Sequence, residues 1–325
     1  MKINNSRMSA IISRVNLNYL TLLLIMIILV AVMSMRAPYF LSAANFAVMV
    51  DTFIMEAIMA LGMTLVILSG GIDLTVTGIL PFSSIMLALL MGSGLSFFPA
   101  AIIVVLGCSL IGFVTNLLRK TLNLHPMVVT MAIAAILKGL NLTITGGSAM
   151  SDFPDSFKAM SSMTVFGMPL SWAVYIVLAV FFIIMTKFNR NFIKVYFVGG
   201  NPEAAKLSGI KIERVYMMVY MISAALAAVA GILTAITYSS ASYSYGTNAD
   251  MRVITTVAIG GTSLTHGGSG SIVGTMLGTL FMAVIYDAFI MSGLSTYYQD
   301  VMTGVFLIAA VLLSELFRYL KEKAR

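Results

Sequence analysis

Ionisable and amide side chains inside long apolar stretches are the residues of this sequence best suited to chemistry. Asp51 and Glu56 share one such stretch, and Arg252 stands at the edge of another. Burying a charge in hydrocarbon costs about 2.5–3.5 kcal/mol, so each group needs a partner, an interface to reach, or a polar cavity. Most of them can reach an interface or pair with one another, but the set as a whole predicts a polar path. We expect four residues to line it: Asn116, Lys138, Asn141 and Asp287.

Catalytic signatures are missing from the sequence. It contains no GxxxxGK[ST] phosphate loop, no HExxH pair and no Gly-x-Ser-x-Gly nucleophile turn with matching partners. Cys108 is the single cysteine, and His125 and His266 are the two histidines, which is too few for a thiolate or multi-histidine metal site. We therefore predict that the chain is not an enzyme and holds neither a cofactor nor a metal.

The elements that position these residues are membrane helices. The 325-residue chain is 60% hydrophobic and 10% charged, whereas a soluble domain carries about 25% charged residues. The apolar stretches do not alternate with polar residues, so they predict helices of roughly 20 residues rather than barrel strands. We predict an all-α polytopic bundle forming one domain, 1–325, with about ten spans: 18–35, 47–68, 74–91, 97–118, 126–145, 169–186, 215–237, 251–265, 271–291 and 297–316. The span 251–265 is short and ends in two glycines, so it is either partial or broken.

The basic residues predict the orientation, since lysine and arginine accumulate on the cytoplasmic side. With both termini inside and ten spans, only Arg36 and Lys158 fall in outer loops, while Lys138 and Arg252 lie within or beside spans. The net charge of +7 then reflects topology, so we expect no nucleic-acid partner. The basic residues expected inside are Lys2, Arg7, Arg14, Arg119, Lys120, Lys187, Arg190, Lys194, Lys206, Lys211, Arg214, Arg318, Lys321, Lys323 and Arg325.

Glycines and small residues predict several local structures. Residues 69–78 contain Gly70-Gly71 and predict a tight inner turn, with Asp73 accepting bonds from free amides of the next helix. The glycines of 267–270 predict a turn between two spans, with an anion cradle as the less favoured alternative. Glycines spaced by four at 270, 274 and 278, and the alanines of 224–231, predict close helix packing within the bundle or at a subunit interface.

The inner loop 187–214 contains a predicted short helix. Asn201 is a capping residue, Pro202 suits the first helical position and Glu203 supplies a first-turn acid. Gly209 then ends the helix after less than two turns. We expect its small residues, Ala204 and Ala205, to form a knob that docks into another protein.

Three stretches of the chain resemble a known family. Glu203-Ala204-Ala205 followed by Gly209 resembles the EAA loop with which bacterial ABC importer permeases contact their ATPase subunits. Residues 64–76, 199–210 and 259–271 together are similar to permeases of the ribose, xylose and autoinducer-2 branch of sugar ABC transporters. The resemblance covers nearly the whole chain in order. It departs at His125-Pro126 and at Lys138-Gly139, where the family has Asn-Pro and Arg-Gly.

This resemblance implies a transport machine of several chains in the bacterial inner membrane. The permease, as a homodimer or heterodimer, would translocate a monosaccharide such as ribose, xylose or galactose. A cytoplasmic ATPase subunit would dock on Glu203, Ala204, Ala205 and Gly209, and an outside sugar-binding protein would deliver the solute. ATP binding would then switch access between the two faces of the membrane.

Two other functions stay open from the sequence. An ion-coupled secondary transporter would use Asp51, Glu56, Lys138 and Asp287 as coupling groups, but it leaves the 199–210 helix unexplained. An ABC permease for branched-chain amino acids or nucleosides would keep the docking helix and change the cargo.

Overall fold

The computed structural model describes residues 17–295 and 297–323, and this part of the chain is almost entirely helical. Lys2, Arg7, Arg14 and Arg325, which the predicted orientation used, lie outside the described residues. Among the described residues, eight helices are long and apolar enough to cross a membrane: α2 (Leu17–Arg36), α3 (Ala43–Leu68), α5 (Phe97–Thr121), α6 (Pro126–Thr145), α8 (Leu170–Phe188), α11 (Ile212–Tyr238), α13 (Ile272–Met291) and α14 (Tyr297–Lys323). The predicted all-α polytopic fold is confirmed.

Two predicted spans are shorter than the others. The segment predicted at 74–91 forms α4 (Val76–Gly92), a 17-residue apolar helix. The segment predicted at 251–265 forms α12 (Ala249–Ile259), which has only 11 residues. At 1.5 Å per residue α12 is about 16 Å long, roughly half the hydrocarbon thickness, which agrees with the predicted partial or broken span.

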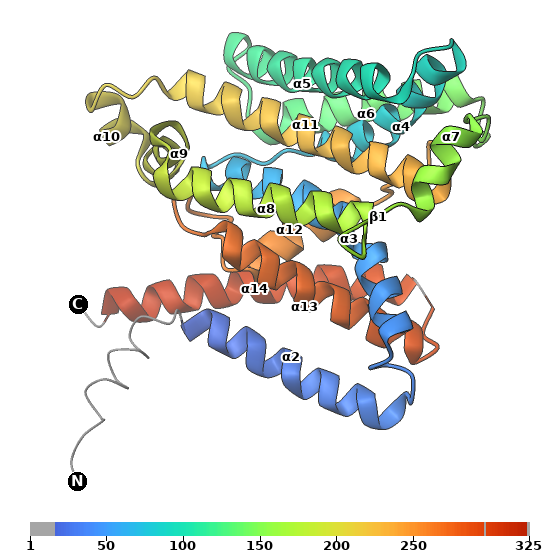
Figure 1. Cartoon of the computed structure of the whole chain (residues 1–325). Coiled ribbons are helices and arrows are strands. Elements are labelled where there is room, and N and C mark those ends of the chain that lie inside the picture. The colour runs from blue at the N-terminus through green and yellow to red at the C-terminus, as the bar shows by residue number, and fades with distance from the viewer. Residues whose placement is uncertain (1–16, 296, 324–325) are drawn as a thin grey trace.

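The helices form a bundle around α3 and α11. Figure 1 shows α4, α5 and α6 on one side of α11, and α13, α14 and α2 beyond α3 on the other. Most of α3, α11 and α13 is buried inside the protein, whereas few residues of α2 and α14 are buried and many of their apolar side chains are exposed. Such surface is stable against lipid tails, because these are as apolar as the side chains.

Small residues let the inner helices approach closely. A Cβ at Gly274 would lie 2.1 Å from the carbonyl oxygen of Gly260, and one at Gly278 would lie 2.2 Å from that of Thr256. These glycines therefore join α13 to α12, and the predicted packing within the bundle is confirmed. The alanines of 224–231 lie in the buried part of α11. Gly270 precedes α13 and instead contacts Thr262 in the preceding loop.

The segment between α3 and α4 is not the tight turn that the sequence predicts. After a turn at Ser69 and Gly70, residues 71–74 have no helical structure, yet all but Ile72 are fully buried. The segment runs beside α6: the Thr130 hydroxyl donates to the Ile72 carbonyl (3.4 Å), and Asn141 Nδ2 donates to that of Gly78 (3.0 Å). Positions 130 and 141 are about 16 Å apart along a helix, so the backbone climbs into the bundle before α4 begins. Non-helical backbone is tolerated at that depth because protein surrounds it.

The remaining elements lie at the two ends of the bundle. At one end are α9 (Arg190–Gly200) and α10 (Pro202–Leu207), and Figure 1 shows that α2 begins and α14 ends on this same side. The predicted loop 187–214 thus contains two helices rather than one. At the opposite end lie α7 (Asp155–Lys158), the 3₁₀ turn η1 (Ala159–Ser162) and a hairpin of β1 (Thr164–Val165) and β2 (Met168–Pro169).

Candidate functional site

A cavity of about 350 Å³ with both polar and apolar walls opens at the end of the bundle opposite α10. Its walls come from α3, from the end of α11 and the loop that follows, and from α12, α13 and the start of α14. At roughly 30 Å³ for each water-sized group, it holds about a dozen such groups. The hydrogen-bonding side chains on its walls include Glu56, Thr234, Tyr245, Arg252, Tyr286 and Gln299.

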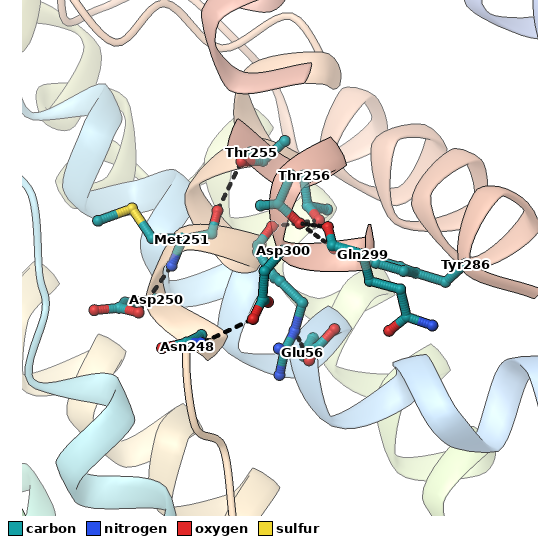
Figure 2. A network of polar contacts seen from close by, with 11 residues as sticks. Glu56, Asn248, Asp250, Met251, Thr255, Thr256, Tyr286, Gln299 and Asp300 are labelled. Carbon is teal, nitrogen blue, oxygen red and sulfur yellow. Dashed lines mark hydrogen bonds and ion pairs between the residues drawn. The ribbon is translucent and has the colours of Figure 1, made fainter. Parts of the chain in front are cut away.

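An ion pair joins two walls of the cavity. Arg252 Nε on α12 donates to Glu56 Oε1 on α3 at 2.6 Å, and the two side chains are 22% and 12% exposed. Arg252 lies within one turn of Ala249, the first residue of α12. Close by, Asn248 Nδ2 donates to Asp300 Oδ2 (3.1 Å), as Figure 2 shows. The Tyr286 hydroxyl bonds to that of Thr303.

The inner end of the cavity is closed. Met55, Met59 and Leu80 form its apolar floor. Beyond them, every residue of α3 from Ala57 to Leu68 is buried. The cavity is therefore open toward one face of the bundle and separated from α10 by packed side chains.

The four residues predicted to line a path do not meet in the structure, and none of them lines this cavity. Asp287 is buried on α13 and accepts a hydrogen bond from Asn45 Nδ2 at 2.6 Å. Asn141 is buried against α4, while Lys138, three residues earlier on α6, is exposed on another face of the helix. Asn116 is buried on α5 and accepts from Arg119 Nε at 3.1 Å.

The other ionisable residues singled out in the sequence divide into two groups. Glu56 and Arg252 pair with each other, as one reading of the sequence expected, and both face the cavity. Asp51 instead accepts from Trp172 Nε1 at 2.6 Å and fastens α3 to α8. Asp73 is buried beside α11, where one carboxylate oxygen accepts from the amide and hydroxyl of Thr75.

The short helix α10 has the ends that its sequence predicts. Asn201 Oδ1 accepts from the amide of Ala204 at 2.9 Å, which caps the first turn. Gly209 has a φ of +80°, and the amides of Gly209 and Ile210 bond back to the carbonyls of Lys206 and Ala205. This double closure is the Schellman motif, which glycine favours because it adopts positive φ without strain.

The surface of α10 differs from the predicted knob in one residue. Glu203 and Ala204 are exposed, but Ala205 is only 4% exposed and packs into the hydrophobic core, which corrects its expected display. Ala205 is the residue of α10 that faces the bundle, so of the two alanines Ala204 alone points outward. The outer surface instead carries Leu207, which is 90% exposed.

Three loops meet in close backbone contact beside α10. A Cβ at Gly199 would lie 1.8 Å from the Leu68 carbonyl oxygen and 2.7 Å from the Gly268 amide nitrogen. That amide donates to the same Leu68 carbonyl at 2.8 Å. Gly267 in turn approaches the backbone of Gly70 and Gly199. We call Gly70, Gly199, Gly267 and Gly268 the glycine junction; it links the end of α9, which directly precedes α10, to the end of α3 and to the loop after α12.

Sequence reasoning missed Tyr245, Tyr286, Gln299 and Leu207. Tyrosine and glutamine carry no charge, so nothing in a helix pattern separates those that face a cavity from those that pack or reach an interface. Leu207 could have been found from the sequence, because it is the one large apolar residue of a capped surface helix whose other residues are proline, small or charged. An exposed leucine there is unexpected unless another surface covers it.

The helical bundle of membrane-spanning length, its cavity with polar side chains and its capped surface helix are the features of a solute-transport component of a membrane. A family model described as "branched-chain amino acid transport system / permease component" matches residues 42–311. The chain belongs to this family of ABC-transporter permeases and is a multi-pass protein of the inner membrane. The resemblance noted in the sequence is thereby confirmed.

Several curated proteins are similar over most of their length. The ribose import permease protein RbsC of Bacillus subtilis (strain 168) is 34% identical over 294 residues, which cover 88% of this chain and 89% of that protein. The probable ABC transporter permease protein YphD of Escherichia coli (strain K12) is 32% identical, covering 95% and 93%. The autoinducer 2 import system permease protein LsrD of Enterobacter sp. (strain 638) is 28% identical, covering 91% and 92%. No solved structure matches the chain.

Proposed function

We propose that this chain is the permease of an ABC importer for a monosaccharide, with ribose as the first solute to test. The observation that carries the proposal is the cavity of about 350 Å³, whose walls offer hydroxyl, amide, carboxylate and guanidinium groups. A five- or six-carbon sugar has about ten to twelve heavy atoms, which suits a space of about a dozen water-sized groups. Relatives named for import of ribose and autoinducer 2 support this cargo.

In the proposed orientation, both termini and α10 lie in the cytoplasm and the cavity opens outward. The basic residues of 187–214 support it, because they lie at the α10 end of the bundle. We count α4 and α12 with the eight long helices as the ten membrane-embedded segments of one domain, 1–325. A solute-binding protein outside would then deliver sugar to the cavity mouth.

The proposed ATPase contact is the outer surface of α10. Glu203, Ala204 and Leu207 would touch the ATPase subunit directly, while Ala205 and Gly209 would hold the helix in place. The glycine junction would carry a displacement of α10 to α3 and to the loop that follows α12. Glu56 lies on α3 and Arg252 lies on α12, which precedes that loop, so the junction would connect ATP-driven movement with the cavity walls.

The proposed path runs through the cavity and the packed region below it, in a dimer with an identical or second permease. Opening the inner side requires separating the buried residues of α3 from their neighbours, which is a switch between two packed states. Contact of the solute with Asn116, Lys138, Asn141 or Asp287 stays a prediction.

The experiment is co-purification of the tagged chain with its ATPase from the native host in mild detergent. Leu207→Glu places a charge on the exposed surface of α10, and Asn191→Glu places the same charge on the exposed surface of α9. We expect the first substitution to remove the ATPase and the second to retain it, with both chains melting like the native one. Equal retention by both variants would contradict the proposed contact.

Uptake by vesicles tests the cargo. Labelled ribose should enter only with ATP and a binding protein, and leucine in excess should not compete. Competition by leucine would favour the branched-chain amino acid cargo named in the family description. Uptake driven by an ion gradient without ATP would favour a secondary transporter.

A further inference from the structure

The charges that line the cavity balance each other. Among its wall residues, all within the described part of the chain, the ionisable groups at neutral pH are one carboxylate, Glu56, and one guanidinium, Arg252. They are in direct contact, with Nε and Oε1 2.6 Å apart. Two further acids, Asp250 and Asp300, lie near the pair outside the cavity walls, where Asp300 is held by Asn248. The cavity therefore has no net charge, and its surroundings are acidic.

The ion pair keeps unused hydrogen-bonding capacity. It occupies one of the five N–H groups of Arg252 and one oxygen of Glu56, and these two side chains make no other hydrogen bond among the described residues. Both side chains are partly exposed to the cavity. The pair thus presents donors and an acceptor side by side, which is the pattern that adjacent sugar hydroxyls require, since each hydroxyl both donates and accepts.

We propose that the Glu56–Arg252 pair determines the charge selectivity of the pathway: it binds hydroxyls of an uncharged, polyhydroxylated solute and leaves no net charge for a phosphorylated or carboxylated one. This inference rests on the proposed function, and it names the residues that recognise the solute. An anionic sugar would lose hydration on entry without gaining an unpaired cation. It would also meet the field of Asp250 and Asp300.

A zwitterionic amino acid would fit the same pair less well. Its carboxylate and ammonium could be neutralised only by separating Arg252 from Glu56 and replacing each with one end of the ligand. An uncharged polyol can bind both residues while they stay in contact. The selectivity therefore comes from the pair remaining joined.

Thiol chemistry measures the charge of the cavity directly. Cys108 is buried, so a cysteine introduced at the cavity residue Thr52 is the reactive one, and Ser161→Cys is an exposed control at the same end of the bundle. The solubilised full chain is treated with anionic and cationic methanethiosulfonates. The rate with the anionic reagent is divided by the rate with the cationic one, and this ratio is then divided by the same ratio for the control. Glu56→Gln should raise this ratio about fivefold and Arg252→Gln should lower it about fivefold, from Coulomb interaction at roughly 8 Å in water. The double variant Glu56→Gln/Arg252→Gln should restore the native ratio.

Protection against a neutral thiol reagent measures selectivity. Ribose should slow modification of Thr52→Cys, while ribose 5-phosphate and leucine at the same concentration should not. In Glu56→Gln, ribose 5-phosphate should protect. The inference would be overturned if ribose and ribose 5-phosphate protected Thr52→Cys equally while the Glu56–Arg252 pair is intact. It would also be overturned if neither single substitution changed the ratio of the two modification rates.

The two proposals fail in different ways. If ATP-driven ribose uptake succeeds but the rate ratios stay unchanged, the transport function stands and the role of the pair is wrong. If the ratios and protection behave as expected but ATP-driven uptake is absent, the cavity selects as inferred and the ABC function is wrong.

Discussion

Replacing Gly199 by alanine tests the glycine junction most sharply. The added methyl would lie 1.8 Å from the Leu68 carbonyl oxygen and 2.7 Å from the Gly268 amide, so it would fall on the hydrogen bond that joins them. Losing that bond costs about 0.5–1.5 kcal/mol, and overpacking adds about 1–3 kcal/mol. We expect Gly199→Ala to destabilise the contact between α9 and the bundle by about 2–4 kcal/mol.

The next residue provides a matched control. A Cβ at Gly200 would have no atom within 4 Å, and its φ is outside the left-handed region, so Gly200→Ala makes the same chemical change without a clash. The assays are thermal unfolding in detergent and ATP-driven uptake. Gly199→Ala should lower the melting temperature by several degrees and abolish uptake, whereas Gly200→Ala should resemble the native chain. Identical behaviour of the two variants would refute the junction.

Three other substitutions separate structural from solute-contacting roles. Asp287→Ala removes the acceptor for Asn45 and should destabilise the protein by about 1.5–3 kcal/mol. Asp287→Asn should keep both stability and uptake. If a stable Asp287→Asn lost uptake, Asp287 would have to contact the solute. Asn141→Leu loses a bond to Gly78 but also removes a buried oxygen without a partner in the described structure, so thermal unfolding should show a cost of about 1 kcal/mol or less. Lys138→Ala removes an exposed side chain and should leave the melting temperature of the single chain unchanged. A large drop in that temperature would contradict the exposed position of Lys138.

Hydrophobic length predicts the helices well because a membrane helix must satisfy its backbone internally and cover about 30 Å. That rule places α2, α5 and α13 to within a few residues. It fails at residues 71–74, where buried backbone is supported by neighbouring helices, which no local pattern records. At α12 the helix ends at Ile259, directly before the two glycines from which the sequence predicts a partial or broken span.

The candidate site is less accessible to sequence reasoning than the fold. Charge in an apolar stretch correctly marked Glu56 and Arg252 as unusual, but the partner of each lies 196 residues away in the chain. The same signal also marked Asp287 and Asn141, whose buried hydrogen bonds serve packing. Capping rules were more informative at α10, because Asn201, Pro202 and Gly209 act within one short segment.

The most direct test of the account is ATP-dependent sugar uptake by the purified assembly. The chain is purified from its native host with whatever ATPase accompanies it, reconstituted in vesicles, and supplied with labelled ribose and the binding protein. The account predicts an ATPase in the preparation and ribose accumulation that stops when ATP is withheld. A chain that purifies alone and moves ribose without ATP would contradict it.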